Sequence, residues 1–191
     1  MLRLKLNLKL RLRRKKIAKR TGEINQMENA ELLHPLVAEA VERFNLQARV
    51  MACDPALADT AAFCEFYKFR PEQTCNAILA AGKTEPIKFA CCLILSSCKL
   101  DVNKVVCRLL EIKKCSFASA EQTIQMTQME IGGVTPVGVS AMPIFVDERV
   151  MDNDLVVLGG GNRSSKLLLN PAELKKIAGL EVVNSLAIPR G

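Results

Sequence analysis

Two glycine clusters in this chain could place several backbone amides around one small anion. Residues 131–138 read IGGVTPVG, and a second cluster at residues 159–161 follows an apolar stretch. Glycine permits positive φ and lets a ligand approach its N–H closely. A turn that Gly and Pro hold in place can therefore aim successive amides at an anion or a developing oxyanion. The alternative is a structural role, because tight connections after regular elements commonly use the same residues.

Few side chains could serve as a nucleophile with its base. His34 is the only histidine, so a Ser-His-Asp or Cys-His system would have to use it, and it stands before Pro35, outside the strand-rich body of the sequence. The stretch GGGNRSSK does not match the G-x-x-x-x-G-K-[ST] phosphate loop, and no G-x-G-x-x-G motif stands in a strand–helix setting. The sequence therefore argues against kinases, nucleotide hydrolases and dinucleotide-binding enzymes.

The eight cysteines form no C-x-x-C pair and lie mostly in apolar segments. A free cysteine in such a segment behaves as a small hydrophobe. With a single histidine in the chain, a zinc knuckle or ribbon is not expected. The N-terminus shows no export signal, so we expect reduced, structural thiols in a reducing compartment, and no metal site.

The basic charge of the chain is concentrated at its N-terminus. Residues 1–22 hold ten Lys or Arg and no acid, whereas the rest of the chain holds 17 bases and 20 acids. We interpret residues 1–27 as a basic, flexible extension that attracts polyanions, and residues 28–191 as one domain. The extension has a period of two and no Ser, unlike mitochondrial presequences. A cytoplasmic protein is expected, with a mitochondrial presequence as the alternative.

The apolar pattern predicts short strands mixed with short helices. Asp101 and Ser119 stand at expected helix N-caps, the latter with Gln122 at the capping-box position, and Asp59 or Thr60 can cap another helix. We expect an α/β (α+β) fold in which a mixed sheet is flanked by short helices. No run reaches the ~20 apolar residues of a membrane span, so no membrane partner is expected. The predicted strands are 47–53, 77–81, 89–95, 113–117, 142–146, 154–158 and 166–169; the predicted helices are 35–44, 59–67, one from 71, 102–110, 119–127 and 170–179.

Several segments together resemble one known family. MEIGGVTPVGVSAMPIFVDERVM, LVVLGGGNRSSKLLLNPAEL and EVVNSLA resemble the C-terminal half of the YbaK-like family, the prolyl-tRNA-synthetase-associated domains that edit mischarged tRNA. SCKLDVNKVVCRLL and KKCSFASAEQT resemble its central segment, and DPALADTAAFCEFYKFRPEQTCNAIL resembles its N-terminal portion more loosely. The resemblance covers residues 46–187, in order and at the spacing of the family.

This resemblance implies a YbaK-like editing-domain fold and a metal-free, cofactor-free aminoacyl-tRNA deacylase. Such an enzyme hydrolyses the ester between a wrong amino acid and the 3′-terminal adenosine of tRNA. The partners implied are the acceptor end of aminoacyl-tRNA and, as a further expectation, an aminoacyl-tRNA synthetase. The hallmark of the family is a G-x-x-x-P loop whose backbone amides, with water and the terminal hydroxyls of the tRNA, would carry the reaction. In this sequence the loop consists of Gly132, Gly133, Val134, Thr135 and Pro136.

The sequence departs from the family at one expected substrate contact. The resemblance places Asn76 where the family usually has a lysine. An asparagine supplies hydrogen bonds but no charge. Three readings stay open: altered substrate choice, another lysine that reaches the site, or a domain that binds without turnover. The other expected substrate-binding residues are Thr60, Asp147, Gly160, Gly161 and Arg163.

Each of these residues also has a structural explanation. Thr60 could cap a helix, and Asp147 could cap a turn at the end of its strand. Arg163 and Lys166 could meet phosphates of the acceptor end or lie in solvent. Two competing functions remain as well. One is a module that binds aminoacyl-tRNA or a synthetase without hydrolysis, and the other is a small-molecule ester hydrolase that uses the same amides.

Overall fold

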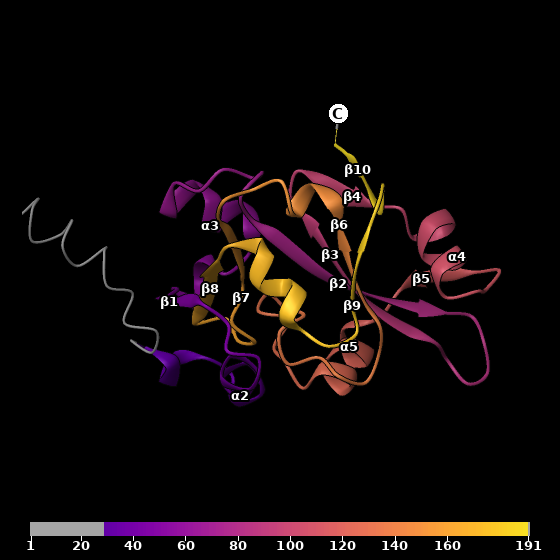
Figure 1. The fold of residues 1–191 in the computed structure, drawn as a ribbon, viewed down its shortest axis with the longest axis horizontal. Helices are drawn as coiled ribbons and strands as arrows, with labels where there is room; N and C mark the ends of the chain where they lie inside the picture. The colour runs from indigo at the N-terminus through magenta and orange to yellow at the C-terminus, as the bar shows by residue number, and fades with distance from the viewer. Residues whose placement is uncertain (1–28, 191) are drawn as a thin grey trace, which may run out of the picture.

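The computed structural model describes residues 29–190 (Figure 1). The basic extension predicted for residues 1–27 lies outside the described residues. Within the described part, no helix is both long and apolar enough to cross a membrane. The predicted mixed α/β architecture is confirmed: strands of both orientations form the centre and short helices surround them.

A five-stranded mixed sheet forms the centre of the fold. Its strands, in spatial order, are β5 (Cys115–Phe117), β2 (Cys75–Gly82), β3 (Phe89–Leu95), β6 (Ile144–Asp147) and β9 (Leu180–Val183). The β2 strand is antiparallel to both β3 and β5, whereas β6 is parallel to β3 and β9. In Figure 1 the long β2 strand crosses the middle of the molecule, with β5 toward one end.

A second, antiparallel sheet lies toward the other end of β2. It consists of β1 (Ala48–Ala52), β8 (Ser165–Leu169) and β7 (Val156–Gly159), in that order. One parallel bridge, between Thr74 and Val157, joins this sheet to the strand β2 region. Among residues 29–190 this is the single β-bridge between the two sheets.

A third strand pair was not predicted from the sequence. It joins β4 (Cys98–Leu100) to β10 (Ala187–Pro189). These strands have three residues each, and β9 has four. Strands this short carry too little alternation to be recognised by period.

The helices begin where local capping residues favour them. Gln122 N donates to Ser119 Oγ at 3.1 Å and Ser119 N donates to Gln122 Oε1 at 2.9 Å, so the predicted capping box is confirmed. Asp101 accepts from Lys104 N at 3.1 Å and starts a π-helical turn. The helices are α2 (Pro35–Arg43), α3 (Thr60–Tyr67), η3 (Val102–Val106), α4 (Cys107–Leu109) and α5 (Ala120–Thr127); the 3₁₀ turns are η1 (Ala30–Leu32), η2 (Pro55–Leu57), η4 (Glu148–Val150) and η5 (Pro171–Lys176).

Three local predictions are wrong in whole or in part. Asp59 occupies the N-cap position of α3, and the helix ends at Tyr67 as predicted, but the Asp59 side chain makes no capping bond and instead lies 3.4 Å from Arg163 Nη1. Pro71 begins a turn and not a helix, because Gln73 O already accepts from Val157 N and draws the chain into the sheet. The last helix is the 3₁₀ segment η5, which ends at Lys176 and does not continue to residue 179.

The two edges of β2 are covered differently. β3 pairs with β2 along seven residues, from Cys75 to Ala81. On the outer edge, β5 pairs only with residues from Ala80 to Gly82, and the second sheet forms its one β-bridge to this chain segment at Thr74. Between these two points no strand of the described residues pairs with the outer edge of β2. This interruption of the sheet positions the site described next.

Candidate functional site

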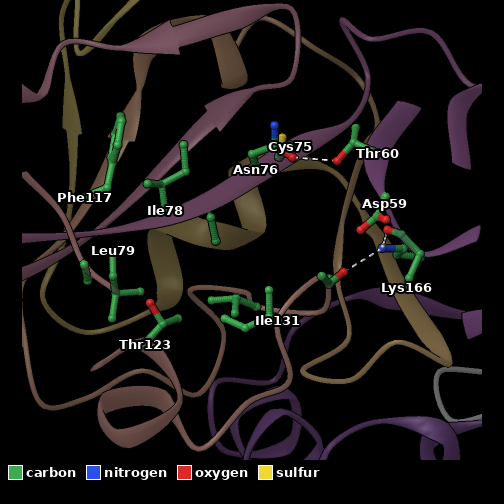
Figure 2. A pocket seen from close by; sticks show the side chains of 16 residues that line it. Asp59, Thr60, Cys75, Asn76, Ile78, Leu79, Phe117, Thr123, Ile131 and Lys166 are labelled. Atoms are coloured by element: carbon green, nitrogen blue, oxygen red, sulfur yellow. Dashed lines mark hydrogen bonds between the residues drawn. The ribbon is translucent and has the colours of Figure 1, made fainter. Parts of the chain in front are cut away.

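A cavity of about 300 Å³ lies at the interruption beside β2. Its walls come from the middle of β2, the start of α3, the loop after β5, the first glycine cluster and the adjoining ends of β7 and β8. Figure 2 shows Asn76, Ile78 and Phe117 on one side of β2, Leu79, Thr123 and Ile131 on the other, and Asp59, Thr60 and Lys166 at the end of the cavity.

The first glycine cluster contains a type II turn. Gly133 N donates to Glu130 O at 2.9 Å, and Gly132 has φ of 90°. The third residue of such a turn needs positive φ, which glycine adopts without steric cost. The N–H of Gly133 is therefore used by the turn, and the prediction that it holds an oxyanion is wrong.

Two other amides of this loop remain available. Gly132 and Val134 both line the cavity, and within residues 29–190 neither N–H has a hydrogen-bond acceptor. Arg163 Nη1 donates to Ile131 O at 3.3 Å. In a trans peptide the carbonyl and the following N–H point in opposite directions, so the N–H of Gly132 points away from Arg163.

The two glycine clusters pack against each other. A Cβ on Gly133 would collide with the backbone of Asn162, and a Cβ on Gly159 would collide with the carbonyl of Gly133. Gly161 N donates to Gly133 O at 2.8 Å. Close backbone contact of this kind requires residues without side chains.

This packing changes the role of the second cluster. Gly160 N donates to Ser165 O at 3.2 Å, and Gly161 N is held by the first cluster. Neither residue lines the cavity, whereas Gly159 does. The substrate contacts predicted for Gly160 and Gly161 are therefore wrong, because both amides are used inside the protein.

Thr135 and Pro136 complete the predicted catalytic loop but do not line the cavity. The Thr135 side chain is fully buried, and its Oγ1 has no hydrogen-bond partner in the part of the chain that the structure describes. Pro136 has no N–H to offer, and its carbonyl accepts from Val139 N at 3.1 Å. These two residues shape the path of the loop beneath the cavity.

Lys166 brings a buried ammonium group to the cavity wall. The residue lies on β8 and is only 7% exposed. Its Nζ donates to Ala58 O at 3.0 Å and to Gly132 O at 3.3 Å, and lies 5.3 Å from the ring centre of Phe63. Burial lowers the pKa of this lysine. Of the three readings of Asn76, the structure thus gives a basis for one: another lysine does reach the site.

Arg163 fastens the glycine turn from outside the cavity. Its Nε and Nη2 donate to Pro55 O at 3.0 and 2.8 Å, and its Nη1 also lies 3.4 Å from Asp59 Oδ1. The guanidinium therefore already donates to acceptors within the protein, and Arg163 does not line the cavity. The predicted contact with phosphates is replaced by a clamp between η2 and the glycine turn.

Thr60 and Asn76 lie together, as the expected substrate site requires. Thr60 Oγ1 donates to Asn76 Oδ1 at 2.7 Å, and both residues line the cavity (Figure 2). An asparagine amide carries two N–H donors besides its oxygen. Among the described residues no acceptor pairs with Asn76 Nδ2, so this group can donate to a ligand.

Asp147 is a structural residue and not part of the cavity wall. Its side chain has no exposed surface. Oδ2 accepts from Ala187 N at 2.8 Å, and Oδ1 accepts from Arg149 N at 3.1 Å and Arg149 Nη1 at 3.3 Å. The carboxylate therefore caps η4 and holds β10 in place, and the predicted pocket role is wrong.

In the described part of the chain, no thiol or hydroxyl on the cavity wall is hydrogen-bonded to a histidine or carboxylate base. Cys75 is the one cysteine on the wall, and burial raises the pKa of its thiol, which keeps it protonated. The His34 side chain caps α2, with Nδ1 accepting from Leu36 N at 3.4 Å, and the backbone N–H of His34 donates to Gly160 O. Contrary to expectation, this histidine packs against the body of the fold, but it does not reach the cavity.

Comparison with known proteins identifies the family of the chain. A family model described as the aminoacyl-tRNA editing domain matches residues 54–177. The chain therefore belongs to the aminoacyl-tRNA editing domain family, and its general activity is aminoacyl-tRNA editing. The matched segment contains α3, β2 and both glycine clusters.

Three solved structures share the fold. The hypothetical protein APE2540 superimposes with a TM-score of 0.71 at 19% identity, covering 80% of this chain and 99% of its own. A protein assigned as a trans-editing enzyme for prolyl-tRNA synthetase gives 0.69 at 21% identity, over 83% and 99% of the two chains. A scaffold used for computational grafting of linear epitopes gives 0.69 at 19%, over 86% and 100%. At these identities the likeness concerns the fold.

Asp147 provides a test of structural against catalytic roles. In Asp147→Asn the side-chain amide can place an N–H against the guanidinium of Arg149 or against Ala187 N, and the charge-assisted bonds to these groups weaken. The free energy of unfolding should fall by about 2 kcal/mol. Denaturant titration measures this loss. Editing activity of the folded variant should match that of the wild type. Unchanged stability with loss of editing activity would instead show that Asp147 acts in the functional site.

Lys166 makes stability depend on pH in a defined direction. Because its pKa is lowered from 10.5, the folded protein releases this proton before the unfolded chain does. Between the lowered pKa and 10.5 the unfolded chain binds more protons, so the free energy of unfolding rises with pH, by up to about 1.4 kcal/mol per pH unit. Urea titrations at several pH values should show this rise in the wild type and not in Lys166→Met. Lys99→Met, at an exposed position of β4, controls for the loss of one charge. Equal pH profiles for wild type and Lys166→Met would contradict the assignment.

Proposed function

We propose that this protein is a trans-acting deacylase that hydrolyses the ester of a mischarged tRNA without a side-chain nucleophile. One observation carries the proposal: the unpaired amides of Gly132 and Val134 stand on the wall of a cavity that also holds a buried ammonium group. Preorganised N–H donors of this kind stabilise the oxyanion that forms when an ester carbonyl is attacked. Membership of the editing-domain family supports the same reaction.

The only reactants are water and the aminoacyl-tRNA. The water oxygen forms a bond to the ester carbon, and the carbonyl oxygen becomes the oxyanion that the loop amides stabilise. As the tetrahedral intermediate collapses, the bond from the carbon to the ribose oxygen breaks. The proton lost by the water passes to the leaving ribose oxygen, directly or through the neighbouring ribose hydroxyl. The products are the free amino acid and the uncharged tRNA.

The mouth of the cavity suits a nucleobase. Phe117 is 53% exposed and Ile131 is 43% exposed, and both line the cavity. A base that stacks on an exposed aromatic ring contributes binding energy regardless of its sequence. The terminal adenine of the tRNA would lie against this rim while the aminoacyl group enters the cavity.

A binding module without turnover is the second candidate. Asn76 favours it, because the polar end of the cavity offers an amide where the related family has a charged lysine. Lys166 favours the deacylase. Its ammonium group is already held by Ala58 O and Gly132 O, so it supports the loop while leaving one N–H donor.

A panel of mischarged tRNAs separates the two candidates. Purified protein is incubated with tRNAs that carry different labelled amino acids, and the release of each is followed against buffer alone. We expect at least one member to be deacylated faster than the buffer control, and uncharged tRNA to inhibit the reaction. Binding of charged tRNA without faster release of any amino acid would establish the module and remove the enzyme. Hydrolysis that uncharged tRNA does not inhibit would favour a small-molecule esterase.

A matched pair of glycine variants tests the loop. Gly132 and Gly179 both have positive φ, 90° and 77°, but a Cβ at Gly132 would meet Arg163, whereas one at Gly179 has no neighbour within 4 Å. Alanine at either position should cost about 1–2 kcal/mol of stability through backbone strain. Only Gly132→Ala should lower the deacylation rate, by at least about tenfold, because its methyl group disturbs the donor loop. Equal activities of the two variants would refute a role for the Gly132 turn.

A further inference from the structure

The outer edge of β2 leaves backbone groups unpaired inside the cavity. Alternate residues of a strand direct their N–H and C=O groups to opposite neighbours. Gly82 N donates to Lys88 O, and Ser96 N donates to Thr74 O. The backbone N–H and C=O groups of even-numbered residues in this region therefore point toward β3. The backbone N–H and C=O groups of odd-numbered residues point toward the outer edge.

Hydrogen bonds at both ends of the interruption confirm this alternation. Val157 N donates to Gln73 O at 2.8 Å at one end, and Ala118 N donates to Leu79 O at 2.9 Å at the other. Between them, neither β5 nor β7 pairs with Ala77, no loop residue among 29–190 bonds to its N–H or C=O, and Ala77 lines the cavity. Ala77 is only partly buried, so a ligand in the cavity can reach its outward donor and acceptor.

An aminoacyl group carries the complementary pair. In a hydrogen-bonded antiparallel pair, one residue accepts at its carbonyl from the N–H of its partner and donates its own N–H in return. An aminoacyl ester has a carbonyl and, one atom away, an α-ammonium group. It can therefore pair with Ala77 as a single residue of an additional strand would.

We propose that the aminoacyl group docks on the outer edge of β2, with its carbonyl accepting from Ala77 N and its α-ammonium donating to Ala77 O. This inference rests on the proposed deacylation for its substrate, and it adds a third amide to those of Gly132 and Val134. The substrate class is an aminoacyl group with a free α-amino group. The Ala77 amide takes the place that the sequence assigned to the amide of Gly133.

The pairing also fixes where the amino-acid side chain lies. Residues opposite each other in an antiparallel pair place their side chains on the same face of the sheet. An L-aminoacyl group would therefore direct its side chain to the face that carries Ala77 and Leu79, where Figure 2 shows Thr123 and Ile131. The Thr60–Asn76 pair lies on the opposite face, beyond the reach of an L side chain but on the side that a D side chain would enter.

A hydrolysis-resistant probe tests the docking directly. The full chain, labelled with ¹⁵N, is titrated with 3′-(L-alanylamino)-3′-deoxyadenosine, in which an amide replaces the ester. The Ala77 amide proton should show the largest downfield shift in β2, while Ile78, paired with β3, stays near its free position. The N-acetylated probe, which lacks the ammonium group, should bind about tenfold or more weakly. Saturation without a shift at Ala77, equal binding of the acetylated probe, or no binding of either probe would overturn the proposal.

Kinetics of two variants at one position give an independent test. Ala77→Pro removes the outward N–H without breaking a bond to β3, which a strand edge tolerates, whereas Ala77→Ser retains it. On a tRNA that the wild type deacylates, Ala77→Pro should be about 100-fold slower than Ala77→Ser, the usual effect of losing one oxyanion donor. Melting curves establish that both variants are folded. Equal rates for two folded variants would overturn the Ala77 contact while leaving deacylation in place. The probe titration remains decisive if the proline variant does not fold or the wild type deacylates nothing.

Discussion

The site depends on one constraint: the backbone groups of a strand must find partners on both of its edges. β3 satisfies the inner edge of β2 along its length, but the outer edge is divided between β5 and the second sheet. These two neighbours stop short of each other, and the cavity occupies the interval. An interrupted sheet thus leaves polar backbone groups facing a cavity.

Two carbonyl contacts orient the free amides of the glycine loop. Arg163 holds the carbonyl of Ile131, and the N–H of Gly161 holds the carbonyl of Gly133. Since carbonyl and N–H point in opposite directions across each peptide, these contacts orient the amides of Gly132 and Val134. Lys166 holds the carbonyl of Gly132, whose peptide carries the Gly133 N–H that the turn uses. The proposed ester hydrolysis uses the two free amides in place of a thiol or hydroxyl nucleophile.

Local sequence predicted what local interactions decide. The capping box at Ser119, the cap at Asp101 and the positive φ of Gly132 each depend on residues a few positions away, and all three could be predicted from the chain. The resemblance of the glycine-rich segments also led to the correct family.

The remaining features depend on distant partners. Asp147 meets Ala187, and Arg163 meets Pro55, across 40 and 108 positions of sequence. No local pattern indicates such pairs. The sequence offered Lys166 as a phosphate contact, but its burial against the carbonyls of Ala58 and Gly132 depends on distant residues. The gap beside Ala77 had none, because it arises from where two other strands end.

The most direct test of this account is amide hydrogen exchange along β2 in the free protein. Asn76 and Ile78 pair with β3, so their amides should be protected, whereas the amide of Ala77 between them should exchange at least ~100-fold faster. Alternating protection of this kind would establish the open edge. Protection of Ala77 equal to that of its two neighbours would show that the edge is closed, and the account of the site would fail.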